Sequence, residues 1–245
     1  QEAIENLDAQ FRLFREQQTV LGGLVELSDK SELLERLSKL QTELNEHLGA
    51  DFAVGTKKGP SFSAWIQNYH PFHWFVEFHG IMSSGGFDVL MGNPPYIELK
   101  TLREYVPRSY STEDAGNLYA LMLEKSFMLR KGAGRSGFIV PVSSISTDRY
   151  QSLQRLLRKN VLHYSSYDDR PSRLFEGLEH IRLTIHLIGS DGDSRFSSRY
   201  NKWASDERPT LFQNLVYASA DVSLVEGSLP KLASSLEAAI VAKLS

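Results

Sequence analysis

Four consecutive residues, Asn93, Pro94, Pro95 and Tyr96, have the clearest potential for chemistry. The side-chain oxygen of Asn93 and the backbone carbonyl of Pro94 are hydrogen-bond acceptors. Two consecutive prolines fix φ and keep the residue before each of them extended, so both acceptors are preorganised. Tyr96 offers an aromatic face for stacking, and its ring rather than its hydroxyl is expected to matter. This set suits the binding of a planar amine, whose N–H groups need acceptors.

The same tetrapeptide could also be a simple turn, because asparagine and proline are common turn residues. Its position favours the chemical role. Residues 87–92 form a short β-rich run that is typical of a buried strand, and the tetrapeptide follows this run directly. Ligands of open α/β sheets bind beyond the carboxyl ends of the strands. We therefore expect the tetrapeptide at the ligand-binding edge of a sheet.

The remaining elements alternate along the chain. Runs typical of buried strands lie at residues 87–92, 137–141, 161–167 and 182–189. Helical spacing of apolar residues occurs at 2–19, 31–48, 117–130, 147–159 and 230–244. Strands and helices that alternate at this pitch indicate an α/β fold with a parallel sheet. Residues 131–135 are expected to be a glycine-rich turn, Ser28 or Asp29 a helix cap, and Pro230 part of a first helical turn.

Several segments resemble one family. Residues 72–78 and 85–96 are similar to the run around motif IV in adenine-specific (N6) DNA methyltransferases of the gamma motif order, as in large type II restriction-modification enzymes with an Asn-Pro-Pro-Tyr motif. Downstream, residues 117–119 resemble the start of motif V, 137–141 resemble motif VI and 174–177 resemble motif VIII. The resemblance extends from about residue 33 to residue 189 and implies a partial Rossmann-like class I methyltransferase sheet, preceded by a helical hairpin.

The resemblance also implies roles for individual residues. Asn93 and Pro94 would bind the target amine, while Tyr96 and Phe175 would stack on an adenine flipped out of double-stranded DNA. Asn117 and Tyr119 would lie near the cofactor, S-adenosyl-L-methionine, although motif V usually begins with an acidic residue where this chain has Asn117. Without the family pattern, Phe175 is equally typical of a core phenylalanine at the entrance of a strand.

The main cofactor loop is not recognisable in the chain. Gly132, Gly134 and Gly137 match a Gly-x-Gly-x-x-Gly pattern, but they precede a strand, whereas a cofactor loop follows a strand and opens a helix. The family's glycine-rich loop normally lies upstream of motif IV, and residues 1–86 contain nothing like it. We therefore expect a fragment that binds S-adenosyl-L-methionine weakly or not at all. An exposed sheet edge would then invite self-association.

Composition limits the class of protein. The formal net charge of −3 argues against a wholesale electrostatic nucleic-acid binder. Acidic residues exceed basic ones at residues 1–48, whereas basic residues exceed acidic ones at residues 149–202. A phosphate-facing surface is therefore expected in the second region, unless these side chains simply solvate helices and loops. The chain has no cysteine, its histidines lack metal-ligand spacing, and its apolar runs are too short to span a membrane. A cytoplasmic protein without a metal site is expected.

The sequence leaves several alternatives open. We predict a helical hairpin and linker at residues 1–60, the catalytic-motif half of a methyltransferase at 61–190, and at 191–245 an extension leading toward a DNA-recognition region. Asn-Pro-Pro-Tyr also serves the methylation of a glutamine side-chain amide or of guanine N2, which are planar amide-like nitrogens. A third interpretation is a non-catalytic, methyltransferase-like module for DNA binding or assembly, and the missing glycine-rich loop is its only support.

Overall fold

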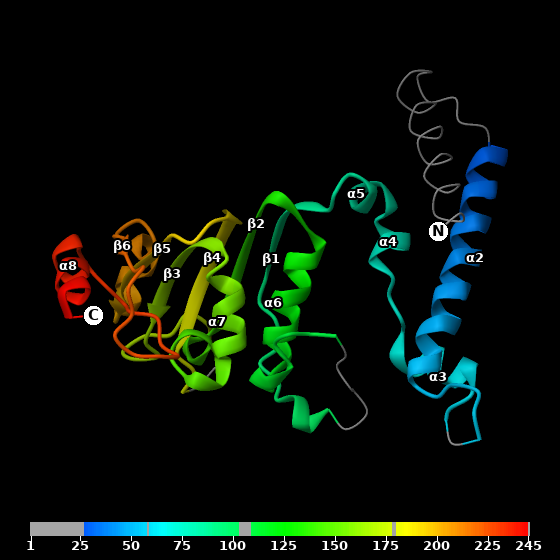
Figure 1. Ribbon diagram of the computed structural model, residues 1–245, viewed down its shortest axis with the longest axis horizontal. Helices are drawn as coiled ribbons and strands as arrows, with labels where there is room; N and C mark the ends of the chain where they lie inside the picture. Colours follow the sequence, from blue (N-terminus) through cyan, green and yellow to red (C-terminus); the bar gives the residue numbers. More distant parts are fainter. Residues whose placement is uncertain (1–26, 58, 103–108, 178–179, 245) are drawn as a thin grey trace. The chain divides into compact units, whose positions relative to one another are not determined.

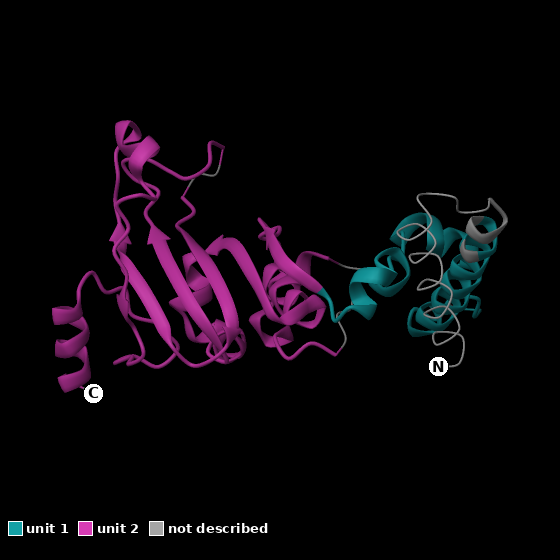
Figure 2. Ribbon diagram, turned by 90° about the horizontal axis from the view of Figure 1, so that it is seen from above, with its two compact units in different colours: residues 1–86 teal, residues 87–245 magenta. Residues whose placement is uncertain are grey.

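The computed structural model describes residues 27–57, 59–102, 109–177 and 180–244. The chain divides into two compact units, residues 1–86 and residues 87–245 (Figure 2). The helix predicted at residues 2–19 lies outside the described residues. The division does not coincide with the boundaries predicted from motifs at residues 60 and 190, so the roles assigned to those three segments stay predictions.

Unit 1 is helical in its described residues. Its helices are α2 (Leu27–Asp51), α3 (Phe62–Tyr69), α4 (Trp74–Glu77) and α5 (His79–Ser83). Helix α2 confirms the helix predicted at residues 31–48 and is longer, so that Ser28 and Asp29 lie inside it and neither is its cap.

A small core holds unit 1 together. Leu40 and Val76 are buried in a cluster with the half-buried Leu37, Leu44 and Phe75. The aromatic residues of this unit are buried to different degrees. Trp65 is buried against Phe52, with ring centroids 5.8 Å apart, whereas other aromatic side chains of this segment stay more than a third exposed: Phe62, Phe72 and Phe78.

Unit 2 is built on one six-stranded sheet with strand order β1-β2-β4-β3-β5-β6 (Figure 1). Its strands are β1 (Phe87–Gly92), β2 (Arg130–Pro141), β3 (Asn160–Tyr167), β4 (Leu183–Asp191), β5 (Arg195–Asn201) and β6 (Ala218–Ser219). Strands β1, β2, β3 and β5 run in one direction, while β4 and β6 run in the other. The α/β class is confirmed, but the predicted parallel sheet is wrong.

The reason for the mixed sheet lies in the connection before β4. A parallel neighbour requires a crossover, usually through a helix. The connection from β3 to β4 contains no helix among its described residues, and β4 turns back between β2 and β3, antiparallel to both. Sequence periodicity identifies such a strand but does not state its direction.

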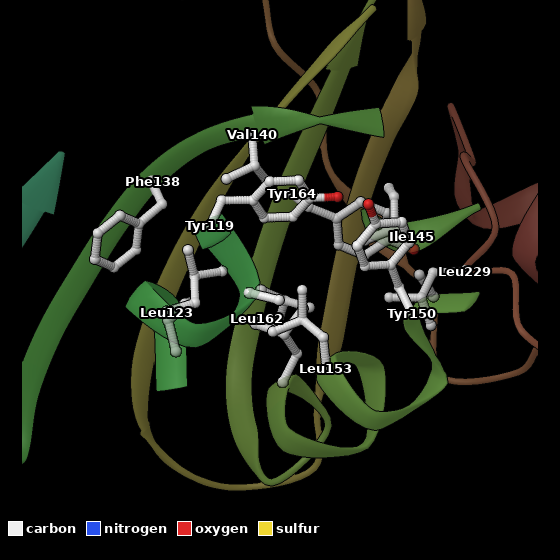
Figure 3. Packing of buried hydrophobic residues seen from close by; sticks show 14 of the residues in the cluster. Tyr119, Leu123, Phe138, Val140, Ile145, Tyr150, Leu153, Leu162, Tyr164 and Leu229 are labelled. Carbon is white, nitrogen blue, oxygen red and sulfur yellow. The ribbon is translucent and has the colours of Figure 1, made fainter. Parts of the chain in front are cut away.

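Two helices, α6 (Leu118–Leu129) and α7 (Gln151–Leu157), pack on the sheet. Alternate residues of β2 and β3, Phe138, Val140, Leu162 and Tyr164, meet side chains of these helices in the main core (Figure 3). Short 3-10 turns lie on the connections: η1 (Leu99–Thr101), η2 (Glu113–Ala115), η3 (Val142–Ile145), η4 (Asp148–Tyr150) and η5 (Ser205–Thr210). The core fixes the ends of the strands, which is where the candidate site lies.

Residues 87–92 form a strand as predicted, but the prediction that this strand is buried is wrong. Among the described residues it pairs only with β2, and Val89 and Met91 are 55% and 79% exposed. The prediction of a glycine-rich turn at residues 131–135 is also wrong, because these residues belong to β2. The pairing shifts register here, and a Cβ on Gly134 would lie 2.8 Å from the carbonyl oxygen of Phe87. Glycine therefore permits close approach of the two strands. The free edge of β1 is where self-association would occur, which stays a prediction.

The C-terminal region completes the sheet and ends in helix α8 (Ser235–Leu244). The prediction that Pro230 lies in its first turn is wrong. Leu229 is buried and its N–H donates to the carbonyl oxygen of Ile145, while the Gln154 side chain donates to the carbonyl of Gly227. This segment therefore packs as extended chain. Across the described ranges, no helix combines the length and hydropathy needed to cross a membrane.

Candidate active site

The Asn93–Tyr96 loop follows the carboxyl end of β1, as predicted. Asn93 and Pro95 are exposed and Pro94 is buried. The Tyr96 hydroxyl lies 2.5 Å from the side-chain oxygen of Asn93 and 3.0 Å from the backbone carbonyl oxygen of Ile139 in β2. The expectation that only the ring of Tyr96 matters is therefore incomplete, because the hydroxyl connects the loop to the neighbouring strand.

Three tyrosine rings form one wall beside this loop. The ring of Tyr96 meets Tyr119 edge-on, with centroids 6.2 Å apart, and Tyr119 stacks on Tyr150 at 5.4 Å. Burial raises the pKa of Tyr96 to about 12 and raises the pKa of Tyr119 well above its usual range. Both hydroxyls therefore stay protonated at neutral pH.

A cavity of about 720 Å³ opens where β1, β2 and β3 end and β4 begins. Its walls combine the three tyrosines with the end of β2 and with charged and polar residues: Tyr96, Tyr119, Tyr150, Pro141, Val142, Ser143, Glu98, Asn117, Asp169, Arg170, His180, Ile181 and Arg182. A cavity of this size, with aromatic walls and a few convergent polar groups, has the character of a small-molecule or base-binding pocket.

Glu98 and Arg149 are site residues that the sequence did not reveal. The carboxylate of Glu98 accepts hydrogen bonds from both terminal nitrogens of Arg149, at 2.6 and 3.1 Å, and from the side-chain nitrogen of Asn117 at 3.3 Å. Arg149 also donates from Nε to the carbonyl oxygen of Ala115. The hydrogen bond from Arg149 lowers the pKa of Glu98. Arg149 thus joins the loop after β1 to the start of α6.

A second charged group stands at the mouth of the cavity. The buried carboxylate of Asp168, at the end of β3, lies 3.4 Å from Nε of Arg182 and 3.7 Å from Nζ of Lys202. Burial acts against ionisation, but hydrogen bonds from Asp169 and the two cations hold the pKa of Asp168 below its usual value. Both cationic side chains remain well exposed, at 60% and 69%.

Phe175 lies on the connection between β3 and β4, whose two ends line the cavity. It is half-buried and is not among the residues that line the cavity. Arg208 holds this connection in place, because its guanidinium donates to the carbonyl oxygens of Arg173 and Leu174. The same guanidinium lies 5.0 Å from the ring centre of the buried Trp203. The connection is therefore anchored beside the cavity.

The structure thus brings some of the predicted residues together and leaves others apart. Tyr96, Asn117 and Tyr119 line one cavity, and Asn93 reaches it through its contact with Tyr96. Asn117 has a clear structural task, since it is the N-cap of α6 and its oxygen accepts from the N–H of Tyr119. Among the described residues, no group of three or more histidine or acidic side chains is placed to hold a metal ion.

The fit of S-adenosylmethionine depends on the accessible polar groups. Asn117 is only 5% exposed and bonds within the chain through both ends of its amide, and Tyr119 is 1% exposed. The cofactor's charged amino-acid end and ribose hydroxyls need accessible donors and acceptors, which these two residues do not offer. A cofactor role for Asn117 and Tyr119 therefore stays a prediction, limited to the wall that they form.

The sheet and the cavity define an α/β protein whose candidate site lies at the carboxyl ends of its co-directional strands. Residues 9–169 match the model of the Eco57I restriction-modification methylase family, which is more than half of the chain. The chain therefore belongs to the Eco57I restriction-modification methylase family.

Two curated relatives agree with this assignment. "Putative type II restriction enzyme and methyltransferase RM.MjaORFECS2P" of Methanocaldococcus jannaschii is 37% identical over 94 residues, which are 38% of this chain and 8% of that protein. "Type II restriction enzyme and methyltransferase RM.Eco57I" of Escherichia coli is 32% identical over 82 residues, 30% of this chain and 8% of that protein. The matches span only a small part of both relatives.

Solved structures that match part of this chain include a nuclease-deletion mutant of the Type ISP restriction-modification enzyme LlaGI in complex with a DNA substrate mimic. It is 13% identical, with a TM-score of 0.44, and the match covers 89% of this chain and 26% of that one. The DrdV–DNA complex is 12% identical, with a TM-score of 0.46, and the match covers 61% of this chain and 19% of that one.

Proposed function

We propose that this chain carries the amine-binding part of a site-specific DNA methyltransferase of the gamma motif order, which transfers a methyl group from S-adenosylmethionine to N6 of adenine. The observation that carries the proposal is the Asn93–Tyr96 loop, which lies at the end of a strand and contributes Tyr96 to the wall of a cavity. Membership of a restriction-modification methylase family supports DNA as the substrate.

The chemistry that the loop would perform is the binding and orientation of a weak nucleophile. The exocyclic amine of adenine is unreactive because its lone pair is delocalised into the ring. Asn93, through its side-chain oxygen, and Pro94, through its backbone carbonyl, would accept one N–H each and draw the nitrogen toward tetrahedral geometry. The two prolines hold these acceptors in place before the base arrives, so little reorganisation is needed. Bound S-adenosylmethionine supplies the methyl group.

The flat walls of the cavity would hold the base. An enzyme that modifies a base in duplex DNA must extrude it, and stacking on an aromatic ring stabilises the extruded state by about 1–3 kcal/mol. Tyr96 would supply one face. Phe175 would supply the other only after its loop moves, because Phe175 does not line the cavity in this structure.

The decisive experiment is the replacement Asn93→Ala in the complete protein, with duplex DNA as substrate and N6-methyladenine as the product measured. The variant should lose methylation, since it lacks an acceptor for the reacting amine, and should bind DNA within a few-fold of wild type. Arg36→Ala, on the exposed face of α2, is the matched control and should retain activity.

Three results would contradict the proposal in different ways. Wild-type turnover by Asn93→Ala would remove the loop from the site. Methylation of a glutamine side chain or of guanine N2 by the wild-type protein would keep the loop but replace the substrate. DNA binding without any methyl transfer would favour the non-catalytic module.

A further inference from the structure

The Tyr96 hydroxyl contacts two oxygen atoms from different parts of unit 2. One is the side-chain oxygen of Asn93 at 2.5 Å, and the other is the backbone carbonyl oxygen of Ile139 at 3.0 Å. Ile139 lies in β2, the second strand of the sheet, where it pairs with Ile185 of β4. The hydroxyl has one proton, which the two acceptors share, and the shorter contact is the one to Asn93. The hydroxyl therefore lies between an exposed side chain and the backbone of a paired strand.

We propose that the Tyr96 hydroxyl is a positioning group that fixes the side-chain oxygen of Asn93 toward the target amine. The inference rests on the proposed function and assigns Tyr96 a second task besides stacking. An amide oxygen has two lone pairs, so it can accept from the hydroxyl and still accept one N–H of the amine. Without the hydroxyl, the exposed Asn93 amide is free to rotate and to present its NH₂ end, which cannot accept.

The ring of Tyr96 sets the position of its hydroxyl. It meets Tyr119 edge-on at 6.2 Å, and Tyr119 in turn stacks on the buried Tyr150. Burial keeps the pKa of Tyr96 near 12, so the hydroxyl keeps its proton and donates at any pH at which the protein is assayed. One side chain thus has two separable parts, a ring for stacking and a hydroxyl for alignment.

The test is Tyr96→Phe in the complete protein, because phenylalanine keeps the ring and removes only the hydroxyl. The single-turnover rate of adenine methylation should fall about ten- to a hundred-fold, as expected for a misplaced catalytic group. DNA affinity should stay unchanged, and so should the emission of 2-aminopurine at the target position, which reports base extrusion. Loss of the 2-aminopurine signal would place the hydroxyl in base capture and overturn the proposal, as would a wild-type rate.

Tyr164→Phe is the matched control. Its hydroxyl also donates to a backbone carbonyl, that of Pro230 at 2.5 Å, but Tyr164 lies in the core and does not line the cavity. This variant removes a comparable hydrogen bond from the fold and should methylate at the wild-type rate. Equal melting temperatures of the two variants would exclude unfolding as the cause of a slow Tyr96→Phe enzyme.

A double-mutant cycle keeps the proposal testable even if Tyr96→Phe is less stable. The background is Asn93→Ser, whose shorter side chain keeps an oxygen acceptor for the amine and therefore a measurable residual rate. If the hydroxyl acts through the Asn93 amide, then adding Tyr96→Phe to Asn93→Ser should cause no further loss of rate, because the amide to be positioned is already absent. An independent ten-fold loss in that background would overturn the inference. Absence of N6-methyladenine with the wild-type protein would instead refute the proposed function, so the two failures are distinguishable.

Discussion

At the scale of single residues, Arg149 is the side chain that joins the segments carrying Glu98 and Asn117 beside the cavity. It donates hydrogen bonds from two nitrogens to the carboxylate of Glu98 and from a third nitrogen to the carbonyl oxygen of Ala115. Both ionic partners are partly exposed, so solvent screening reduces the strength of the pair, but two parallel bonds and a fixed backbone acceptor make it stronger than an ordinary surface ion pair. Its main effect is to join the loop that carries Tyr96 to the turn before α6, the helix that carries Tyr119.

Replacing Arg149 should therefore cost a measurable but modest amount of stability. Arg149→Gln should lower the free energy of unfolding by about 1 kcal/mol at pH 7, the upper end for an exposed pair. Arg36→Gln, which breaks the exposed Arg36–Glu32 pair on α2, should cost about 0.3 kcal/mol. Urea unfolding of both variants measures the two losses of free energy. Equal losses would mean that the segments beside the cavity do not depend on Arg149.

The difference in unfolding free energy between wild type and Arg149→Gln should depend on pH with a defined sign. The pKa of Glu98 is lower in the folded protein than its ordinary value of 4.5. The stability contributed by the pair is therefore fully present above about pH 4.5 and is lost as the pH falls through the lowered pKa. The gap between wild type and Arg149→Gln should shrink in urea unfolding at about pH 3, and a gap that widens there would contradict the assignment.

Part of the site could be predicted from the sequence and part could not. The Asn93–Tyr96 tetrapeptide is local, so its residue types and its place after a β-rich run were sufficient to find it. The partners that complete the site are distant: Ile139 is 43 residues from Tyr96, and Arg149 is 51 residues from Glu98. No periodicity relates such positions, and a lone Glu98 or Arg149 looks like any charged residue of a loop.

At the scale of elements, the connection between β3 and β4 carries Phe175 and depends on a residue from beyond β5. Arg208, in η5, holds the backbone of Arg173 and Leu174. Because the contacts are to carbonyl oxygens, they fix the course of the loop whatever its side chains are. The position of Phe175 relative to the cavity is therefore set by Arg208.

Arg208→Ala should ease the capture of the target base without unfolding unit 2, because the anchor holds Phe175 outside the cavity and the loop must leave that position to stack on the base. The dissociation constant for DNA with an extruded base should fall about ten-fold, the effect of about 1.4 kcal/mol, while the melting temperature changes little because Arg208 is exposed. Arg199→Ala, an exposed arginine of β5, serves as the comparison. Equal effects of the two variants would show that only charge is lost.

The elements themselves were predicted with uneven success. Helix α6 and strands β3 and β4 agree with predicted segments to within two residues at each end, and β2 contains the strand predicted at 137–141, because apolar periodicity reports burial. The direction of β4, the inclusion of residues 131–135 in β2 and the late start of α8 were missed. Each of these depends on a contact from elsewhere, such as the close approach of Gly134 to Phe87 of β1 or the burial of Leu229 against η3.

At the scale of the whole molecule, the net charge of −3 coexists with a rim of three exposed cations beside the cavity, which the carboxylates of Asp168 and Asp169 partly neutralise. Arg170 and Arg182 line the cavity, and Lys202 shares the carboxylate of Asp168 with Arg182. The three side chains come from the ends of β3, β4 and β5. If the proposed function holds, these cations are the candidates for contacts with DNA phosphates.

Arg182→Gln and Lys202→Gln should each flatten the dependence of DNA affinity on salt. Each phosphate contact that is lost should reduce the slope of log Kd against log salt concentration by about 0.9. Lys243→Gln, an exposed residue near the end of α8, should leave the slope unchanged. If neither rim variant alters the slope, the two cations serve only to neutralise Asp168.

The packing of Arg208 over Trp203 gives this protein a built-in optical probe. Trp203 is the one tryptophan of residues 87–245, since Trp65 and Trp74 lie in unit 1. Its ring is 3% exposed and lies beneath the guanidinium that holds the Phe175 loop. Replacing Trp65 and Trp74 by phenylalanine would leave a spectrum from Trp203 alone. Release of the loop would expose that ring to water and shift the maximum of its fluorescence emission to longer wavelength. The motion of the loop can therefore be timed without attaching a label.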